Sequence, residues 1–204
     1  MKHVFVSSTF KDMQFERDAL HTVAAIGINE KLAPYGEEVY FGDLRWGVNT
    51  TSLDSEEGCR RVLEVCLDEI DDCRPYMIVL VGERYGWIPG GDAIRGAALA
   101  KGVEIDDGVS VTQLEIEYGA LLNGERGGEI FFYFRELDTD GMSEEQLADY
   151  TSESELHRQK IDALKAKIRA IYPDAVRTYT ARFDAKEGSV VGLEGFLEAV
   201  TADL

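Results

Sequence analysis

The segment "HVFVSSTFKDMQFERDAL" (residues 3–20) decides the fold, because it joins an apolar strand directly to an amphipathic helix. Its first part, "HVFVSS" (3–8), is a short run of apolar and β-branched residues, which is typical of a strand buried inside a sheet. From residue 10 to residue 32, apolar residues recur with roughly helical spacing and predict a helix. Three hydroxyl residues lie at the junction: Ser7, Ser8 and Thr9.

The same alternation of strand and helix continues along the chain. Further strands are predicted at "EEVYFGDLRWG" (37–47), "PYMIVLVG" (75–82), "EIFFYF" (129–134) and "VRTYTARF" (176–183), and further helices at 55–74, 143–172 and 192–204. Near-continuous apolar strands are typical of parallel sheets, which are buried on both faces. We therefore expect an α/β, flavodoxin-like three-layer fold, with about five mostly parallel strands and helices on both faces. A Gly/Ala-rich stretch (about 88–110) is interpreted as an insertion loop.

Length and charge limit the classes of protein to consider. The 204 residues fit a single domain spanning 1–204. Lys and Arg number 21 against 39 Asp and Glu, for a net charge of -18, and such a surface repels phosphate backbones. We therefore expect no nucleic-acid partner. No stretch reaches the roughly 18 apolar residues of a membrane span, so no membrane partner is expected either.

The three cysteines indicate the compartment. Their odd number, without an export signal at the N-terminus, favours a reducing, cytoplasmic environment. They lie at positions 59, 66 and 73, and this seven-residue spacing places them along one stripe of a helix. We interpret the stripe as core packing rather than as a metal site, because histidines are few and distant.

Ligands of such sheets bind beyond the carboxyl ends of the strands, where the winding direction reverses. We expect that point between the first and third strands, where the hydroxyl residues 7–9 would face the stretch 82–85. Ser8 and Thr9 are suited to bind a ribose or phosphate, or alternatively to cap the next helix. Arg84 is suited to bind a phosphate, or alternatively to pair with a surface acid, and Tyr85 to line the crevice. Neither a P-loop nor a Gly-rich dinucleotide motif is present.

Four motifs in order carry a resemblance to a known family: "VFVSSTFKDMQFERDAL", "DLRWGV", "IVLVGERYGW" and "VTQLEIEYGAL". Together they resemble a TIR-like domain family at the N-terminus of STAND-type NTPases, which include nephrocystin- and telomerase-associated proteins. The resemblance covers about residues 3 to 135. It implies that the chain is the N-terminal part of a longer protein with C-terminal NTPase and sensor domains, and that it self-associates through TIR-like domains.

The chain is more distantly similar to true TIR domains, in which a glutamate of a W-x-x-x-E-[LI] helix acts on NAD. The corresponding helix would begin near Val111, and its "LEI" places Glu115 at the glutamate position, although about twenty residues separate this helix from Trp87. Glu117, on the other side of the apolar stripe, is the alternative. The loop that borders the site in TIR domains corresponds here to three residues: Asp43, Arg45 and Trp46. Trp46 would stack on a base or pack in the interior.

The resemblance implies an effector of a cytosolic immune or antiphage sensor that hydrolyses the N-glycosidic bond of NAD when oligomerised. That cleavage passes through an oxocarbenium-like centre, which a carboxylate such as that of Glu115 stabilises. Because nicotinamide is already a cationic leaving group, no cofactor is expected, and NAD would be the substrate. Two alternatives stay open: a non-catalytic TIR-like adaptor, and a nucleoside deoxyribosyltransferase-like enzyme.

Overall fold

The computed structural model describes residues 1–43, 56–90, 92–122 and 129–204. Arg45 and Trp46 lie outside these residues. The strands are β1 (Lys2–Ser7), β2 (Val39–Gly42), β3 (Tyr76–Val81), β4 (Glu129–Asp138), β5 (Val176–Asp184) and β6 (Ser189–Val191). They form one sheet in the order β2-β1-β3-β4-β5-β6, in which only β6 pairs antiparallel. The first five strands thus have the flavodoxin-like order.

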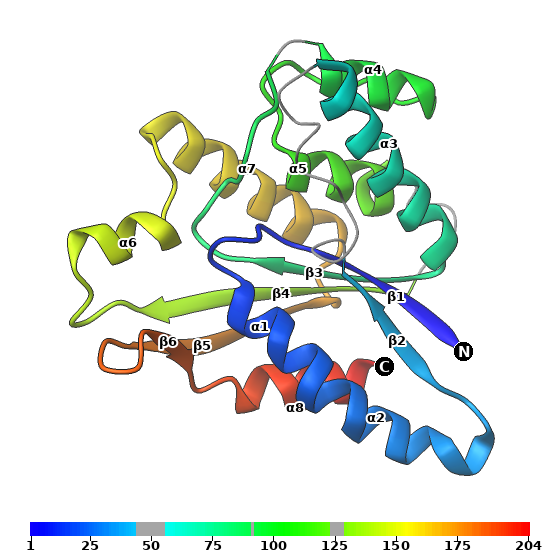
Figure 1. Ribbon diagram of the computed structural model, residues 1–204, viewed down its shortest axis with the longest axis vertical. Helices are drawn as coiled ribbons and strands as arrows, with labels where there is room; N and C mark the ends of the chain where they lie inside the picture. The colour runs from blue at the N-terminus through cyan, green and yellow to red at the C-terminus, as the bar shows by residue number, and fades with distance from the viewer. Residues whose placement is uncertain (44–55, 91, 123–128) are drawn as a thin grey trace.

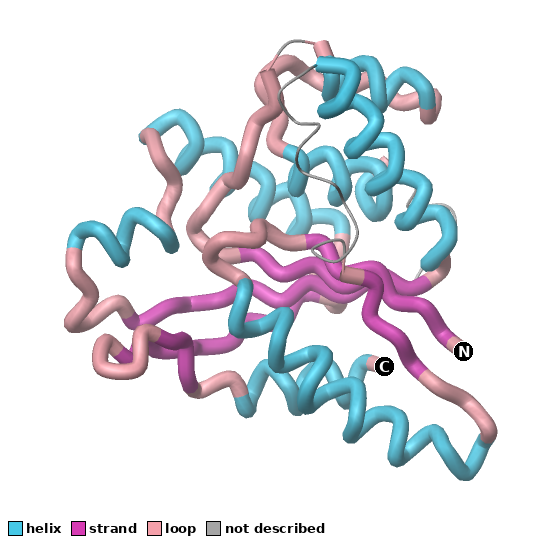
Figure 2. The backbone as a smooth tube through the Cα atoms, viewed as in Figure 1, coloured by secondary structure: helices cyan, strands magenta, loops and turns pink. Residues whose placement is uncertain are grey.

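Helices cover both faces of this sheet (Figures 1 and 2). One face carries α3 (Glu56–Cys73), α4 (Ala93–Ala100), α5 (Val111–Ile116) with the π-helical turn η4 (Glu117–Leu121), and α7 (Glu155–Ile171). The other carries α1 (Gln14–Ala19), the π-helical turn η1 (Leu20–Ala24), α2 (Ala25–Leu32) with the short η2 (Ala33–Tyr35), and α8 (Glu194–Asp203). The shorter α6 (Glu144–Tyr150) follows β4. The predicted α/β three-layer fold is confirmed.

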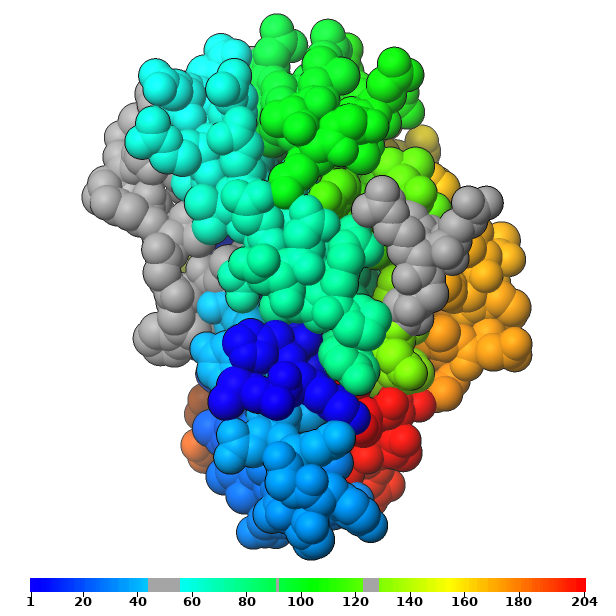
Figure 3. Space-filling model, turned by 90° about the vertical axis from the view of Figure 1, so that its right-hand side faces the viewer, coloured from blue at the N-terminus to red at the C-terminus, as the bar shows by residue number. Residues whose placement is uncertain are grey.

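Alternation along the central strands divides the core in two. Phe5 of β1 and Val79 of β3 pack with the helices of the first face, whereas Val6 and Ile78 pack with those of the second. Successive side chains of a strand point to opposite faces, so strands buried on both sides need apolar residues at almost every position. Figure 3 shows α3 and α4 (cyan to green) above α2 and α8 (blue and red), on either side of the sheet edge.

Helix α3 follows the predicted segment 55–74 closely. All three cysteines are buried on it, together with Leu63, Leu67 and Ile70. The predicted core-facing stripe is therefore confirmed. None of the described helices combines the length and apolarity that crossing a membrane requires.

Other helix predictions need correction. The Gly/Ala-rich stretch (about 88–110), predicted as an insertion loop, contains α4, whose buried Ala93, Ile94, Ala97 and Ala98 belong to the same core cluster as α3. Gly96 of α4 faces α3: a Cβ there would lie 2.9 Å from Cδ of Arg60. The predicted helix 10–32 is interrupted by η1, and the segment 143–172 is split into α6 and α7. Ser154, whose hydroxyl accepts from the backbone N–H of His157, caps the start of α7.

Strand order determines where the sheet can receive a ligand. From β1 the chain passes to β2 on one side and then returns to β3 on the other. The winding direction therefore reverses between β1 and β3, at the predicted point. Residues that follow these two strands, Ser8–Asp12 and Gly82–Tyr85, border the carboxyl edge at this position.

Candidate functional site

Glu115 reaches the carboxyl end of β1. The Ser110 hydroxyl caps α5 by accepting from the backbone N–H of Gln113 at 3.2 Å, which fixes the start of the helix. One turn later, Oε2 of Glu115 accepts a hydrogen bond of 2.7 Å from Oγ of Ser7, the last residue of β1. Both residues are buried. Residues 108 positions apart thus meet at the reversal point.

This environment changes the acidity of Glu115. Burial raises the pKa of its carboxyl group to about 7, against the opposing effects of the Ser7 hydrogen bond and the positive charge of Arg17. The pKa of the Cys66 thiol is raised, mainly by burial and secondly by the negative charge of Glu115, which shows that α3 lies close by. Glu115 therefore gains and loses its proton near neutral pH.

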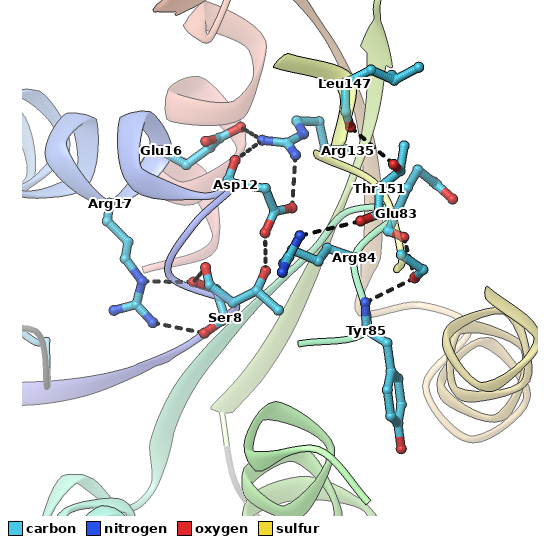
Figure 4. Close-up of polar contacts among 12 residues, drawn as sticks. Ser8, Asp12, Glu16, Arg17, Glu83, Arg84, Tyr85, Arg135, Leu147 and Thr151 are labelled. Carbon is cyan, nitrogen blue, oxygen red and sulfur yellow. Dashed lines mark hydrogen bonds and ion pairs between the residues drawn. The ribbon is translucent and has the colours of Figure 1, made fainter. Parts of the chain in front are cut away.

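Arg17 connects the ends of β1 and β2. Its buried guanidinium donates from Nε to Oγ of Ser8 (2.7 Å), from Nη1 to Oδ1 of Asp43 (2.7 Å) and from Nη2 to the carbonyl of Val6 (3.0 Å). Figure 4 shows the side chain of Arg17 directed toward Ser8. A planar guanidinium with several donors suits this task better than a flexible ammonium group. Ser8 is thus held by Arg17, and its own hydroxyl donates to the carbonyl of Thr9 at 2.9 Å.

Sequence reasoning missed Arg17, although a signal was present. Positions 13, 17, 20 and 24 form one helical stripe, and all four residues are buried. A charged residue on an apolar stripe indicates a buried ion pair. Its partner Asp43 is buried at the end of β2, and Oδ2 of this carboxylate lies 3.4 Å from Nε2 of His21.

A second arginine organises the other side of the β1–α1 loop. Arg135 of β4 donates from Nη2 to Oδ2 of Asp12 (3.0 Å) and from Nη1 to Oε1 of Glu16 (2.8 Å), as Figure 4 shows. Thr9 donates its hydroxyl hydrogen bond to Asp12, and Tyr179 donates to Glu16 at 3.1 Å. Burial raises the pKa of Asp12 to about 6, although the charge of Arg135 opposes this. Sequence analysis missed this cluster too; its signals were two acids four residues apart and an arginine ending an apolar strand.

Arg84 and Tyr85 follow β3, and their hydrogen bonds go to residues other than Glu115. Arg84 donates to the carbonyl of Ala148 at 3.0 Å and pairs with Glu153, so it faces the connection between α6 and α7. Figure 4 also shows its contact with Thr151. The buried Tyr85 donates its hydroxyl hydrogen bond to Gln113 of α5. The structure therefore brings Ser7 together with Glu115, and Ser8 with Asp43 through Arg17, but places Arg84 and Tyr85 in other contacts.

Two cavities lined by described residues lie elsewhere. One, of about 560 Å³, lies between α4, α5 and α7 and includes Glu117 and Lys167. The other, of about 340 Å³, lies beyond β3 and includes Glu83 and Arg158. Neither cavity reaches Glu115. Within the described parts of the chain, no group of His, Cys, Asp and Glu is arranged to hold a metal ion.

Comparison with known proteins places the chain among its relatives. A TPR repeat-containing protein of Dictyostelium discoideum is 32% identical over 81% of this chain and 10% of its own length. Telomerase protein component 1 of Mus musculus is 30% identical over 98% of this chain and 8% of its own length. The putative tetratricopeptide repeat protein 41 of Homo sapiens is 28% identical over 80% of this chain and 15% of its own length.

This chain thus spans only about a tenth of the length of the curated relatives it matches. No solved structure matches it significantly. The predicted relation to telomerase-associated proteins is confirmed by the second of these relatives. Residues 3–189 match a family described as "Domain of unknown function (DUF4062)", and because this match covers most of the sequence, the chain belongs to that family.

Proposed function

We propose that this chain is a TIR-like domain that hydrolyses the N-glycosidic bond of NAD or a closely related nucleotide, with Glu115 as the catalytic carboxylate. The observation that carries the proposal is the Ser7–Glu115 hydrogen bond of 2.7 Å at the carboxyl edge, where the sheet reverses its winding. Sheets of this type bind nucleotides at that position. The motifs that resemble TIR domains support the same assignment of Glu115.

The proposed reaction needs one carboxylate from the protein and a water molecule. The bond between ribose C1′ and the nicotinamide nitrogen breaks, and its electron pair leaves with nicotinamide, which becomes neutral. The carboxylate of Glu115 stabilises the positive charge that develops at C1′. Water then adds to C1′ and its proton passes to Glu115 or to solvent. A carboxyl group whose pKa is raised to about 7 suits both roles, because a cationic substrate beside it favours the ionised form.

The supporting residues have distinct roles in this proposal. Ser7 orients the carboxylate of Glu115, and Arg17 holds Ser8 and Asp43 at the neighbouring strand ends. Because Ser7 and Glu115 are buried, substrate entry requires the carboxyl edge to open. This requirement fits an activity that appears only when several copies cluster. By resemblance, we place the domain in a cytosolic STAND-type immune or antiphage sensor, with NTPase and sensor domains that drive the clustering.

A specific observation favours a second candidate, a non-catalytic TIR-like adaptor. Two of the predicted ligand-binding residues already have partners within the protein: Ser8 accepts from Arg17, and Arg84 pairs with Glu153. Polar groups satisfied in this way stabilise a fold without any ligand. In that case the domain would act by binding further copies of itself.

The test is NAD cleavage by the full-length protein, free and clustered on a multivalent support, with nicotinamide and ADP-ribose measured by chromatography. Clustered wild-type protein is expected to release both products in equal amounts. Glu115→Gln should lower the rate at least ~100-fold, whereas Glu117→Gln, on the same helix, should retain it.

Other outcomes of this experiment would support one of the two alternative functions. Self-association without nicotinamide release from the clustered wild-type protein supports the adaptor. Transfer of a deoxyribosyl group between bases, without NAD cleavage, would instead indicate the deoxyribosyltransferase-like reaction.

A further inference from the structure

The larger cavity, of about 560 Å³, has the size of a small-molecule site. The elements that line it, α4, α5 and α7, cover the same face of the sheet as α3 (Figure 1). We call it the α5–α7 cavity. Its apolar lining consists of Leu99, Ile105, Val109 and Leu122, and its charged lining includes Glu117 and Lys167. Leu99 and Leu122 are more than half exposed, so the cavity offers uncovered apolar surface to a ligand.

Glu117 is the polar centre of this cavity. Lys167 of α7 donates from Nζ to Oε1 at 2.8 Å and to Oε2 at 2.7 Å. The two partners differ in exposure: the side chain of Glu117 is 9% exposed, whereas that of Lys167 is 46% exposed. The acid is therefore the buried member of the pair. The ammonium group of Lys167 is able to leave the pair and be solvated by water.

The local backbone fixes the position of Glu117. This residue begins the π-helical turn η4, and single π-helical turns often occur at functional sites. Gly119 in the same turn lies so close to the sheet that a Cβ would come within 2.5 Å of Sδ of Met77. The turn thus packs closely against the sheet, and Glu117 lies about 200° around the helix axis from Glu115. The cavity is consequently separate from the proposed catalytic site.

Charge and burial decide which ligand the cavity suits. An anionic ligand would bind Lys167 and leave the buried Glu117 without its cation, which is costly. A cationic ligand would replace Lys167 on Glu117, and the half-exposed lysine would move into water. Three acids line the cavity, Glu104, Asp106 and Glu117, against two cations, Arg95 and Lys167. Arg95 already pairs with Asp107, so the local charge also favours a cation.

We propose that the α5–α7 cavity binds a small organic cation, whose primary ammonium group takes the place of Lys167 on Glu117 and whose apolar group packs against Leu99, Ile105 and Leu122. The proposal does not depend on the function assigned to Glu115.

The test compares two probes of nearly equal size and opposite charge, phenethylammonium and phenylacetate. NMR titration of the protein should show saturable binding of phenethylammonium and much weaker binding of phenylacetate. Glu117→Gln should weaken phenethylammonium binding at least tenfold. The matched control is Glu83→Gln, which breaks another acid–lysine pair made by α7, with Lys165, and should leave binding unchanged.

Lys167→Met provides a second, independent readout. Without the competing lysine, phenethylammonium should bind several-fold more tightly and raise the Tm of this variant more than that of the wild-type protein. Tighter binding of phenylacetate than of phenethylammonium would overturn the proposal. So would loss of phenethylammonium binding in Lys167→Met, or its retention in a folded Glu117→Gln protein.

Discussion

Arg17 and Arg135 occupy comparable positions on either side of the β1–α1 loop, and both are buried at the carboxyl edge of the sheet. Arg135 binds two carboxylates, those of Asp12 and Glu16. Arg17 forms an ion pair with Asp43, and its other N–H groups donate to Ser8 and to the carbonyl of Val6 in β1. The positive charge of Arg17 also acts on Glu115. The same type of side chain thus neutralises two acids on one side of the loop, whereas on the other it connects two strand ends and lowers the pKa of Glu115.

The largest effect is expected from Arg135→Met. This change leaves two buried acids without their common cation and should lower the free energy of unfolding by about 3–5 kcal/mol, measured by urea denaturation. Replacing the acids as well, in Asp12→Asn/Glu16→Gln/Arg135→Met, should recover much of the loss. A loss below about 1 kcal/mol for Arg135→Met would show that the cluster does not stabilise this side.

Arg17→Met should lower the free energy of unfolding by less, about 2 kcal/mol, because it leaves one buried carboxylate without its cation, whereas Arg135→Met leaves two. Its distinguishing effect is on Glu115. Removing the positive charge of Arg17 should raise the pKa of Glu115 above about 7. Carbon-13 NMR of the glutamate carboxyl groups measures this shift, with Arg135→Met as the control. Equal shifts of the pKa of Glu115 in the two variants would show that Arg17 does not act on Glu115 more than Arg135 does.

The contrast between the arginines also shows what the sequence was able to predict. Five strands and α3 followed from apolar runs and helical periodicity, because local patterns encode them. The short β6 has too few residues for a periodic signal. The helix α4 was predicted as a loop because its stretch of sequence is rich in glycine. Glu115, chosen from its "LEI" match to TIR domains, lies at the carboxyl end of β1, where it accepts a hydrogen bond from Ser7. Its catalytic role stays a prediction.

Buried charges were the part that local patterns did not reveal. Arg135 meets Asp12 across 123 positions of sequence, and Arg17 meets Asp43 across 26. Only the packed fold decides whether such residues find partners or face water. Arg84 illustrates the same limit: it follows β3 as expected, but Glu153 and Ala148, 69 and 64 positions later in the sequence, take up its donors.

A third test concerns the proton on Glu115. Because the pKa of this carboxyl group is about 7 in the folded protein and about 4.5 in the unfolded chain, the folded state binds more protons between these values. The contribution of Glu115 to stability should therefore fall by about 3 kcal/mol as the pH rises from 4.5 to 7, and stay constant above. Glu115→Gln removes this dependence, so its stability relative to wild type should increase over the same range.

Urea denaturation at several pH values measures that difference. Asp12, whose pKa is also raised, titrates in both proteins and cancels in the comparison. A difference that does not change with pH would mean that Glu115 has an ordinary acidity and that its burial has little electrostatic effect.

The smallest effect is expected from Ser7→Ala, which removes one buried hydrogen bond worth about 1 kcal/mol. Because the Ser7 hydroxyl donates to the carboxylate, its loss disfavours the ionised form and should raise the pKa of Glu115. Thr9→Ala is the matched control, since it removes a hydroxyl donor from Asp12 in the Arg135 cluster and should leave Glu115 unchanged. If Glu115 titrates identically in wild type and Ser7→Ala, then the Ser7 hydroxyl does not orient the carboxylate, and the contact that carries the proposed function has no energetic basis.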